Sequence, residues 1–500
     1  MDYEIGSIDG FKHVTDPRVH NISIDSNDLC SLWTMCVSDY SDNIALEYEG
    51  NRLTYRELDD QISVFRTVLK EYGCKKEDRI AILASNSIDC VRSLFAAVTL
   101  GCVAVMLPPD LDVNRIENIR NDFALSVIVY QQKFVDAIGD LKSKHPDHVF
   151  INASEKRTAK TPAAVPDAED PCLILFTGGT TGIPKGALLS HRAVVRGIKN
   201  GALGIGNIEK QRFLLLLPLF HVFGLFVNLL TCFYIGGHIY ISSSEKDLVR
   251  DIKEFKPTII SFVPALAEVA LKLSKQLEGH LFNPEFRTGF IGGTDVPQYL
   301  VEEYAKLGVN LYPGYGMTEA SDLILGNPNQ LEKPNSVGIP YPNEEIKIVN
   351  DELWARGENF LTDYIGTDEC AWNNEGWFQT GDLARIDEDG YVYLLGRIKD
   401  VIILQNGQNV YPSVLEARFN DLPFVKDCEV YVERSGNEEF LALDVILRDT
   451  TESKEAILDK LWDINNMQVS TEVVRKIHIR EEDFERTANK KIVRRKNGQS

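Results

Sequence analysis

The strongest constraint on the fold is an alternation of helical and extended patterns between Leu53 and Tyr130. Thr54, followed three residues later by Glu57, forms the capping-box pattern that starts a helix. That helix is expected to end near Gly73. Buried strands are predicted at Arg79–Leu83, Val103–Leu107 and Ser126–Tyr130, with a helix at Asp89–Leu100. Alternation of this kind predicts parallel sheets covered by helices.

The pattern changes twice along the chain. Ala153–Asp170 is polar and rich in proline, which indicates a connector, and the α/β pattern resumes at Cys172. From Ser336 to Tyr393, short strands and turns predict a small β unit. The remainder, after Arg397, has a mixed pattern and the size of a small domain, roughly a hundred residues.

Composition limits the class of protein. A chain of 500 residues is too long for one simple core and indicates two or more domains. A net charge of −21 argues against a general nucleic-acid binder, although a pocket can be locally positive. The nine cysteines show no metal or disulfide spacing, and the N-terminus lacks the pattern of a secretory signal. We therefore expect a cytoplasmic protein.

One uncharged segment, from Phe213 to Ile241, is long enough for a membrane span. Proline, glycine, histidine and asparagine residues interrupt it. These interruptions favour a strand at Phe213–Leu217, a turn at Pro218 and a buried helix over about Gly224–Ile235. No integral membrane span is expected, and a membrane-embedded enzyme is the alternative.

The stretch Phe176–Gly186, FTGGTTGIPKG, has the chemistry of a loop that holds phosphate oxygens. Its glycines let backbone N–H groups approach an anion, its threonines add donors and Lys185 adds a positive charge. Because Pro184 precedes this lysine and Gly186 follows it, no helix begins there, unlike in the common nucleoside-triphosphatase loop. A flexible surface turn is the alternative.

Four further motifs offer groups suited to a nucleotide. Gly314-Tyr-Gly-Met-Thr-Glu319 supplies an aromatic ring, a hydroxyl and a carboxylate of the kind that Mg²⁺ prefers. Thr380-Gly-Asp382 places a carboxylate at a tight turn, where it can accept two ribose hydroxyls. Gly396-Arg-Ile-Lys-Asp400 supplies a guanidinium. The basic run Arg486–Lys496 stands out in an acidic protein, and a solvated tail is expected to include Lys490, Arg494, Arg495 and Lys496.

Taken in order, these motifs resemble the acyl-adenylate-forming superfamily, which includes acyl-CoA synthetases, the adenylation domains of peptide synthetases and beetle luciferases. The resemblance covers almost the whole chain. It implies an α/β fold with a large N-terminal domain, residues 1–397, built of doubly wound α/β subdomains and a small β-barrel-like unit. A small mobile α+β C-terminal domain, residues 398–500, is expected to follow.

The resemblance also implies a role for each motif. ATP is expected to lie with its β- and γ-phosphates under a loop formed by Thr177, Gly178, Gly179, Thr180, Thr181, Gly182 and Lys185. The residues expected around the adenine and the rest of the nucleotide are Gly292, Gly293, Thr294, Gly314, Tyr315, Gly316 and Met317. Asp382 is expected to bind the ribose with help from Arg397.

Catalytic roles are implied for four residues: Thr318 at the α-phosphate, Glu319 at Mg²⁺, His221 beside the acyl carboxylate, and Lys491, which reaches in from the small domain. Lys399 marks the expected hinge. The implied reaction joins a carboxylic acid to AMP with release of pyrophosphate. A domain rotation then brings the loop Gln405–Gln408 to the site, and the thiol of coenzyme A takes the acyl group.

The chain departs from the family pattern at several places. Gly178 stands where the family usually has serine, and Lys490 replaces a glycine, which leaves two adjacent lysines, of which Lys491 precedes the expected Ile-Val-Arg pattern. Asn406 stands where luciferases carry a lysine, which argues against their oxidation chemistry. His221-Val222 replaces the Phe-Asp of amino-acid-activating domains, which favours a plain aliphatic or aryl acid.

Two alternatives stay open. The first is an enzyme that performs the same first step but loads the phosphopantetheine of an acyl carrier protein instead of coenzyme A. The second is a non-catalytic nucleotide-binding protein. The sequence does not identify the small carboxylic acid substrate, the oligomeric state or the pathway.

Overall fold

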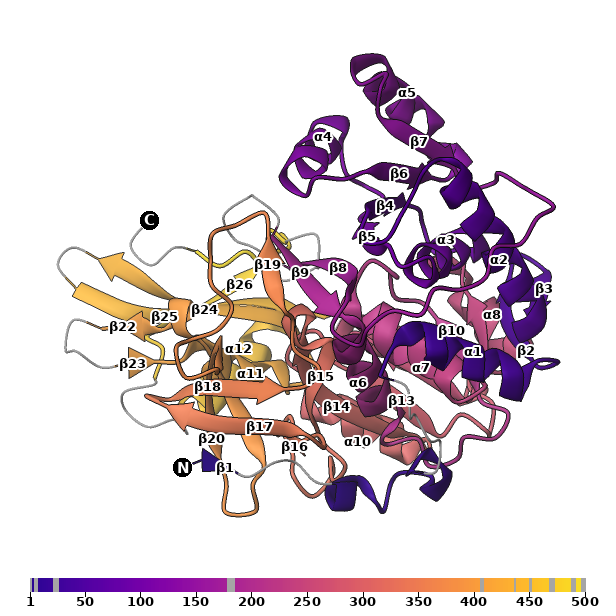
Figure 1. Cartoon of the computed structure of the whole chain (residues 1–500). Helices are drawn as coiled ribbons and strands as arrows, with labels where there is room; N and C mark the ends of the chain where they lie inside the picture. Colours follow the sequence, from indigo (N-terminus) through magenta and orange to yellow (C-terminus); the bar gives the residue numbers. More distant parts are fainter. Residues whose placement is uncertain are drawn as a thin grey trace.

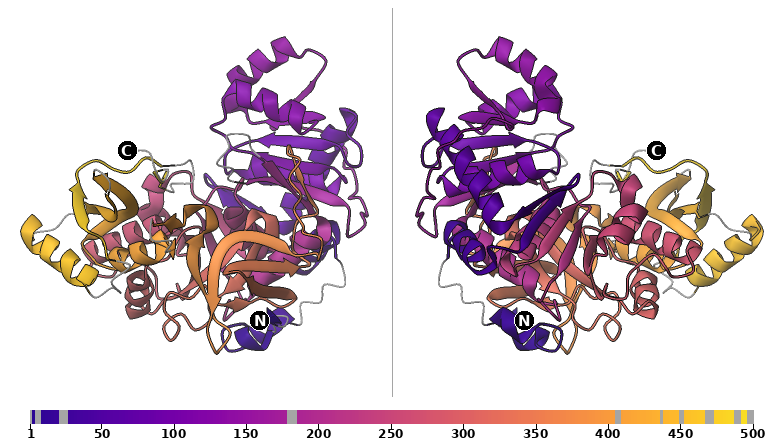
Figure 2. Two further views of the ribbon diagram at one scale, coloured as in Figure 1. Left: turned by 90° about the vertical axis from the view of Figure 1, so that its left-hand side faces the viewer. Right: turned by 90° about the vertical axis from the view of Figure 1, so that its right-hand side faces the viewer.

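The computed structural model describes residues 2–3, 8–20, 27–177, 185–404, 409–435, 438–448, 452–466, 473–486 and 492–495. Two large mixed sheets and a smaller antiparallel sheet precede a separate C-terminal unit (Figure 1). The two views in Figure 2 place this unit, in yellow, on one side of the lower layer and the first sheet with its helices above it.

The first large sheet has seven strands in the order β19-β9-β8-β5-β4-β6-β7. It is parallel from β8 to β7 and antiparallel where β8 meets β9 and β9 meets β19. Two predicted strands are confirmed with unchanged bounds as β4 and β5, and the third starts one residue later as β6. The bounds are β19 (Asp363–Ile365), β9 (Lys185–Ser190), β8 (Pro171–Thr177), β5 (Val103–Leu107), β4 (Arg79–Leu83), β6 (Val127–Tyr130) and β7 (Val149–Asn152).

Helices cover both faces of this sheet. Successive residues of one strand therefore pack into two different cores. Ile80 and Ile82 pack with α2 (Tyr55–Glu71) and α3 (Ile88–Thr99). Ala81 and Leu83 pack on the opposite face with α4 (Val113–Asp122) and α5 (Val135–Lys144). The capping box is confirmed, since the Thr54 and Glu57 side chains each accept the other residue's backbone N–H.

The second large sheet has nine strands in the order β16-β15-β14-β13-β12-β10-β11-β2-β3. Pairing is parallel from β14 to β2 and antiparallel at both ends. The bounds are β16 (Ile339–Pro340), β15 (Asp322–Gly326), β14 (Asn310–Met317), β13 (Thr288–Ile291), β12 (Ile259–Phe262), β10 (Arg212–Leu215), β11 (His238–Ile241), β2 (Ile44–Tyr48) and β3 (Asn51–Thr54).

This sheet is also covered on both faces, which confirms the doubly wound architecture. Leu214 and Ile260 pack with α8 (Leu248–Phe255), α9 (Pro264–Gln276) and α10 (Gln298–Lys306). Their neighbours Phe213 and Ile259 belong to the core on the opposite face, which also contains side chains of the first large sheet, such as Ile80 and Ile82. The helices of that layer are α1 (Leu29–Tyr40), α6 (His191–Ala202), η4 (Gly224–Leu230) and α7 (Thr231–Tyr234).

The uncharged segment is a strand, a helix and a second strand inside this core. Its predicted helix is confirmed, but η4 is a π-helix and only α7 is an α-helix. Gly224 is required at the start of η4, because a Cβ there would lie 2.3 Å from the carbonyl oxygen of Pro218. In the part of the chain that the structure describes, no helix has the length and apolar character of a membrane span.

The small β unit predicted after Ser336 is a five-stranded antiparallel sheet in the order β1-β17-β18-β20-β21. Its strands are β1 (Asp2–Tyr3), β17 (Glu344–Val349), β18 (Glu352–Gly357), β20 (Phe378–Ile386) and β21 (Val392–Arg397). The pairing of β20 with β21 sets Asp382 directly opposite Arg397.

The C-terminal unit has its own apolar core, which includes Val430, Leu443 and Leu461. That separate core supports a boundary between residues 397 and 398, which remains a prediction. The unit comprises η7 (Ile398–Asp400), β22 (Ile402–Ile403), β23 (Asn409–Val410), α11 (Pro412–Asn420), β24 (Val425–Ser435), β25 (Glu438–Leu447), α12 (Lys454–Asn466) and β26 (Lys476–Arg480).

The prediction of a solvated basic tail is wrong for Arg494, which is half-buried, and only partly right for Arg495, which is exposed but held in ion pairs. Nη2 of Arg494 lies 2.5 Å from Oε2 of the buried Glu416, and Nε of Arg495 lies 3.5 Å from Oε2 of the buried Glu429. Because these carboxylates are buried, they require cationic partners, and the end of the chain is folded back to supply them.

A tight turn between β14 and β15 packs against α6. The turn contains η6 (Thr318–Ala320) and two non-glycine residues of positive φ, Ser321 at 47° and Asp322 at 91°. A Cβ on Gly197 of α6 would lie 2.2 Å from the carbonyl oxygen of Ser321. A Cβ on Gly316 would lie 1.5 Å from that of Asp322. The turn can therefore form only because both positions lack a side chain.

We expect Gly197→Ala to lower the free energy of unfolding by about 1–3 kcal/mol, the usual cost of overpacking a filled core. Urea denaturation measures this change. Gly139→Ala is the matched control, since Gly139 lies in α5 and a Cβ added there would meet no atom within 4 Å. That control should leave stability unchanged or raise it by up to about 1 kcal/mol. Equal stability of the two variants would contradict the packing argument.

Candidate active site

The phosphate-loop motif lies at the tip of the β8–β9 hairpin. Thr177 and Lys185 are paired across it, and Oγ1 of Thr177 donates to the carbonyl oxygen of Lys185 at 3.5 Å. A strand, not a helix, begins at this lysine, as predicted. The loop residues between them, Gly178, Gly179, Thr180, Thr181 and Gly182, lie outside the described part of the chain.

Tyr364 connects this hairpin with Glu319. Strand β19 runs beside β9, so Tyr364 lies opposite Ala187. Nζ of Lys185 lies 4.6 Å from the centroid of the Tyr364 ring and 2.5 Å from Oε2 of Glu369. The Tyr364 hydroxyl donates to Oε1 of Glu319 at 2.9 Å. One phenol thus joins the lysine expected at the phosphates to the carboxylate expected at the metal.

The protonation of Tyr364 suits this role. Burial, strengthened by the neighbouring Glu319 carboxylate, raises the pKa of Tyr364 far above its ordinary value. The phenol therefore remains a hydrogen-bond donor throughout the neutral range. Sequence analysis missed Tyr364, because a single tyrosine in a short edge strand carries no motif; only the pairing of β19 with β9 reveals it.

A second cluster forms around Asp382. The Tyr315 hydroxyl donates to its Oδ2 at 2.6 Å, and Nε of Arg397 lies 2.8 Å from its Oδ1. The backbone N–H of Asp382 donates to Oγ1 of Thr380 at 3.1 Å. Asp382 and Tyr315 are buried, and burial together with Asp382 raises the pKa of Tyr315. Three residues predicted separately from three motifs are therefore in direct contact.

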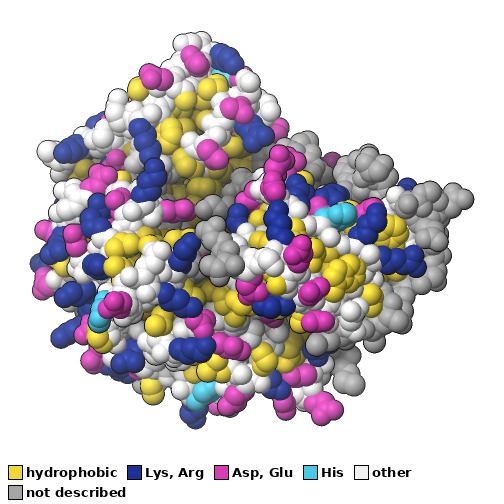
Figure 3. All heavy atoms as spheres, turned by 180° about the vertical axis from the view of Figure 1, so that it is seen from behind, with side chains coloured by type: hydrophobic (Ala, Val, Ile, Leu, Met, Phe, Trp, Pro, Cys, Tyr) yellow, Lys and Arg dark blue, Asp and Glu magenta, His cyan; other side chains and the backbone are white. Residues whose placement is uncertain are grey.

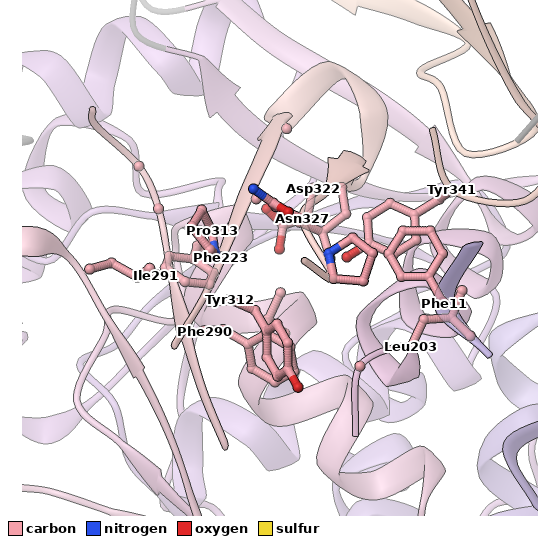
Figure 4. A pocket seen from close by; sticks show the side chains of 18 of the residues that line it. Phe11, Leu203, Phe223, Phe290, Ile291, Tyr312, Pro313, Asp322, Asn327 and Tyr341 are labelled. Atoms are coloured by element: carbon pink, nitrogen blue, oxygen red, sulfur yellow. The ribbon is translucent and has the colours of Figure 1, made fainter. Parts of the chain in front are cut away.

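A cavity of about 100 Å³ lies beside this cluster (Figure 4). Gly292, Gly293, Gly314 and Gly316, which were expected at the nucleotide, contribute to its wall. The other wall residues come from the N-terminal segment, the end of α6, the start of η4, strands β13 to β15 and the segment after β16. They include Phe11, Leu203, Val222, Phe223, Phe290, Tyr312, Asp322 and Tyr341. Tyr315 lies between two of these glycines, so strand β14 joins the Asp382 cluster to the cavity.

The remaining predicted residues take different positions. His221 is half-buried and directly precedes Val222 and Phe223 of the cavity wall. Met317 and Thr318 are half-buried in the turn that leads to Glu319, whereas Thr294 is exposed.

The expected hinge and the residues after it are only partly described. Lys399 is exposed in η7, directly after the last strand of the five-stranded sheet. Lys491 and the loop of residues 405–408 lie outside the described part of the chain.

Outside the motifs, Asp28, Cys30 and His191 form a group whose ligand atoms lie within 4.8 Å of one another. Each has a structural explanation. Asp28 caps α1 by accepting from the N–H of Ser31 at 2.8 Å, and Nδ1 of His191 accepts from the N–H of Leu29 at 3.2 Å. Burial raises the pKa of Cys30 to about 12, so its thiol stays protonated and is a poor metal ligand. Glu319 remains the stronger candidate for a cation.

Charged side chains of both signs lie on the face shown in Figure 3, where acidic and basic side chains of the described residues are interspersed. In a chain with a net charge of −21, a local cation such as Lys185 can still attract an anionic ligand.

Comparisons with known proteins point the same way. The family model described as AMP-binding enzyme matches residues 34–359. The chain is 30% identical to a 2-succinylbenzoate–CoA ligase of Oceanobacillus iheyensis, over 82% of this chain and 87% of that protein. It is 27% identical to a long-chain-fatty-acid–CoA ligase of Escherichia coli O157:H7, over 86% and 87%.

A solved structure of o-succinylbenzoate coenzyme A synthetase from Bacillus subtilis, in complex with ATP and a magnesium ion, superposes with a TM-score of 0.79 and 25% identity. The superposition covers 93% of this chain and 98% of that chain. Since the family model alone spans more than half of the sequence, the chain belongs to the AMP-binding enzyme family.

Proposed function

We propose that the protein is an ATP-dependent acid–thiol ligase that activates a carboxylic acid as its acyl-adenylate and transfers the acyl group to coenzyme A. One observation carries the proposal. The buried Tyr315 and Asp382, with their exposed partner Arg397, and the apolar cavity share strand β14, so a nucleotide sugar and an organic acid can lie on adjacent sides of one strand. The CoA ligases among its relatives support this reaction class.

In the first step, a carboxylate oxygen attacks the α-phosphorus of ATP, the bond to the β-phosphate breaks and pyrophosphate leaves. Both reactants are anions, so the site must neutralise charge and fix their positions. We assign Asp382 to the ribose hydroxyls, Lys185 to the terminal phosphates and Thr318 to the α-phosphate. His221 is placed beside the carboxylate of the acid, and Lys491 between that carboxylate and the α-phosphate.

Magnesium fits the donor chemistry at Glu319, because carboxylate oxygens are preferred ligands of this ion. When bound, it would neutralise charge on the phosphate oxygens. Two described residues orient Glu319. The Tyr364 hydroxyl donates to its Oε1, and the backbone N–H of Leu361 donates to its backbone carbonyl oxygen at 2.7 Å.

In the second step, the thiol sulfur of coenzyme A attacks the acyl carbon, the bond to AMP breaks and the thiol proton is released. We propose that the C-terminal unit, residues 398–500, rotates about Lys399 between the two steps, so that one site serves both reactions. Few polar links join the described residues of this unit to the large domain, which supports the motion. They include the ion pair of Arg448 with Glu268 and the bond from the N–H of Gln298 to Oδ1 of Asp421, at 3.0 Å.

A cytoplasmic location is part of the proposal. All nine cysteines are free and eight of them are buried, which suits a reducing compartment. Transfer to an acyl carrier protein is the competing second step. A comparison of coenzyme A with a phosphopantetheinylated carrier protein as acceptor distinguishes the two.

The reaction class predicts exchange of labelled pyrophosphate into ATP that depends on an added carboxylic acid. A panel of aliphatic and aryl acids, each assayed with and without coenzyme A, measures both steps. We expect exchange without coenzyme A and consumption of its thiol when it is present. Tight ATP binding without exchange for any acid would favour the non-catalytic alternative.

For Lys491→Ala, we expect acyl-adenylate formation to fall by about 10²–10³-fold, the typical effect of removing one preorganised charge contact. Thioester formation from supplied acyl-adenylate should be largely retained, because the lysine acts only in the first step. Lys490→Ala is the matched control and should retain both steps. An equal loss of both half-reactions in the Lys491 variant would refute the two-state assignment.

For Tyr364→Phe, we expect the Mg²⁺ concentration that gives half-maximal activity to rise by about 10–100-fold, because the group that orients the Glu319 carboxylate is lost. A titration of activity with magnesium measures this. Tyr393→Phe, which removes a hydroxyl 3.3 Å from Oδ2 of Asp387, is the control and should leave the titration unchanged. An unaltered midpoint in Tyr364→Phe would show that Glu319 is not a metal ligand.

A further inference from the structure

The cavity beside strand β14 contains a carboxylate that lacks a partner. Asp322 lines the cavity and is only 6% exposed. Its Oδ2 has no hydrogen-bond partner, and no ion pair reaches it within the part of the chain that the structure describes. In Figure 4, Asp322 lies on one side of the cavity, and the rings of Phe290 and Tyr312 lie on the other.

The neighbouring polar side chain, Asn327, is fully used by the protein. Its Nδ2 donates to the carbonyl oxygens of Lys333 and Ser336 at 3.0 and 2.9 Å, and its Oδ1 accepts from the N–H of Asn329 at 3.0 Å. Asn327 therefore has a structural role in holding the loop after β15. The same explanation does not apply to Asp322, which lines the cavity and has one carboxylate oxygen without a partner among the described residues.

Asp322 lowers the stability of the fold in two ways. A buried polar atom without a partner loses the hydrogen bond that it makes to water in the unfolded chain. A non-glycine residue with φ of 91° adds backbone strain. Burial also raises the pKa of Asp322 to about 7, which is the response of a carboxyl group without a compensating donor. Residues of this kind cluster at active sites and ligand-binding sites.

The rest of the wall limits the size of that ligand. The cavity is about 100 Å³, and most of its wall is made of aromatic rings, aliphatic side chains and glycine backbone. An engineered cavity of about 150 Å³ holds one benzene molecule, whereas sites for larger ligands reach about 300–1,000 Å³. The space therefore suits a compact group of about one ring, not a long acyl chain.

We propose that Asp322 determines specificity in the acid-binding pocket, and that the substrate is a compact carboxylic acid with a hydroxyl or amino group that donates a hydrogen bond to Asp322. This inference rests on the proposed function and narrows its substrate class. It refines the expectation of a plain acid, which was based on Val222, because the pocket has its carboxylate at position 322 instead.

A site built to accept a hydrogen bond discriminates strongly against a substrate that lacks the donor, because the buried acceptor then stays unpaired. We therefore expect kcat/KM for the best donor-bearing acid to exceed that for its parent acid by at least about 10²-fold. The test uses matched sets: benzoate with its 3- and 4-hydroxy and 3- and 4-amino derivatives, and hexanoate with 6-hydroxy- and 6-aminohexanoate. Pyrophosphate release is the measured quantity.

Two variants test the residue itself. Asp322→Asn keeps the shape and tolerates the positive φ, and it should reduce the preference for the donor-bearing acid by at least about tenfold. Asp322→Leu should abolish or invert the preference. Asp351→Asn changes an exposed aspartate with φ of 65° and should leave the preference intact. Equal use of parent and substituted acids by the wild type, or an unchanged preference in Asp322→Asn, would overturn the proposal.

A binding measurement separates this proposal from the proposed function. The same acids are added to the wild type and to Asp322→Asn, and the thermal midpoint of each protein is recorded. Donor-bearing acids should raise the midpoint of the wild type more than that of the variant, even if no acid supports pyrophosphate release. If release occurs but neither the midpoint nor the preference responds to Asp322→Asn, the ligase assignment stands and the role of Asp322 is refuted.

Discussion

The close approach of two backbone segments at Gly316 and Asp322 is the constraint on which the site depends. Because position 316 has no side chain, β14 and β15 can be joined by a very short turn. Three side chains leave this hairpin in different directions: Tyr315 toward Asp382, Glu319 toward Tyr364, and Asp322 into the cavity. The turn thus fixes the relative positions of the proposed ribose, metal and acid subsites.

The three carboxylates around this hairpin differ in how they are satisfied. Among the residues that the structure describes, the buried Asp382 is bound by a guanidinium and a phenol, the Glu319 carboxylate accepts from one phenol, and Asp322 has no partner for one oxygen. The most completely paired carboxylate is the one assigned to a neutral sugar. Those assigned to a cation and to a hydrogen-bond donor retain acceptor capacity. The carboxylates with fewer protein partners are therefore the ones assigned to a cation or to a hydrogen-bond donor.

The sheets and the C-terminal unit contribute differently to function. Both large sheets are packed on two faces, which gives the hairpins at their edges a rigid base. The C-terminal unit closes its own core and satisfies its own buried carboxylates, Glu416 and Glu429, with arginines from the end of the chain. A unit that is complete in this way can move without exposing a core, as the proposed two-step reaction requires.

The sequence alone determined the two-sided α/β architecture, two strands to the residue, and the identities of most groups proposed to bind the nucleotide. Hydrophobic period, capping pairs and motif order are local properties, so they can be read along the chain. The tertiary structure decided which groups meet. Tyr364 reaches Glu319 only through the pairing of β19 with β9, and Arg494 is held in an ion pair only because Glu416 is buried beside it. Asp322 can be recognised as a candidate site residue only from the packed structure, because a missing hydrogen-bond partner is a property of the surroundings and not of the residue.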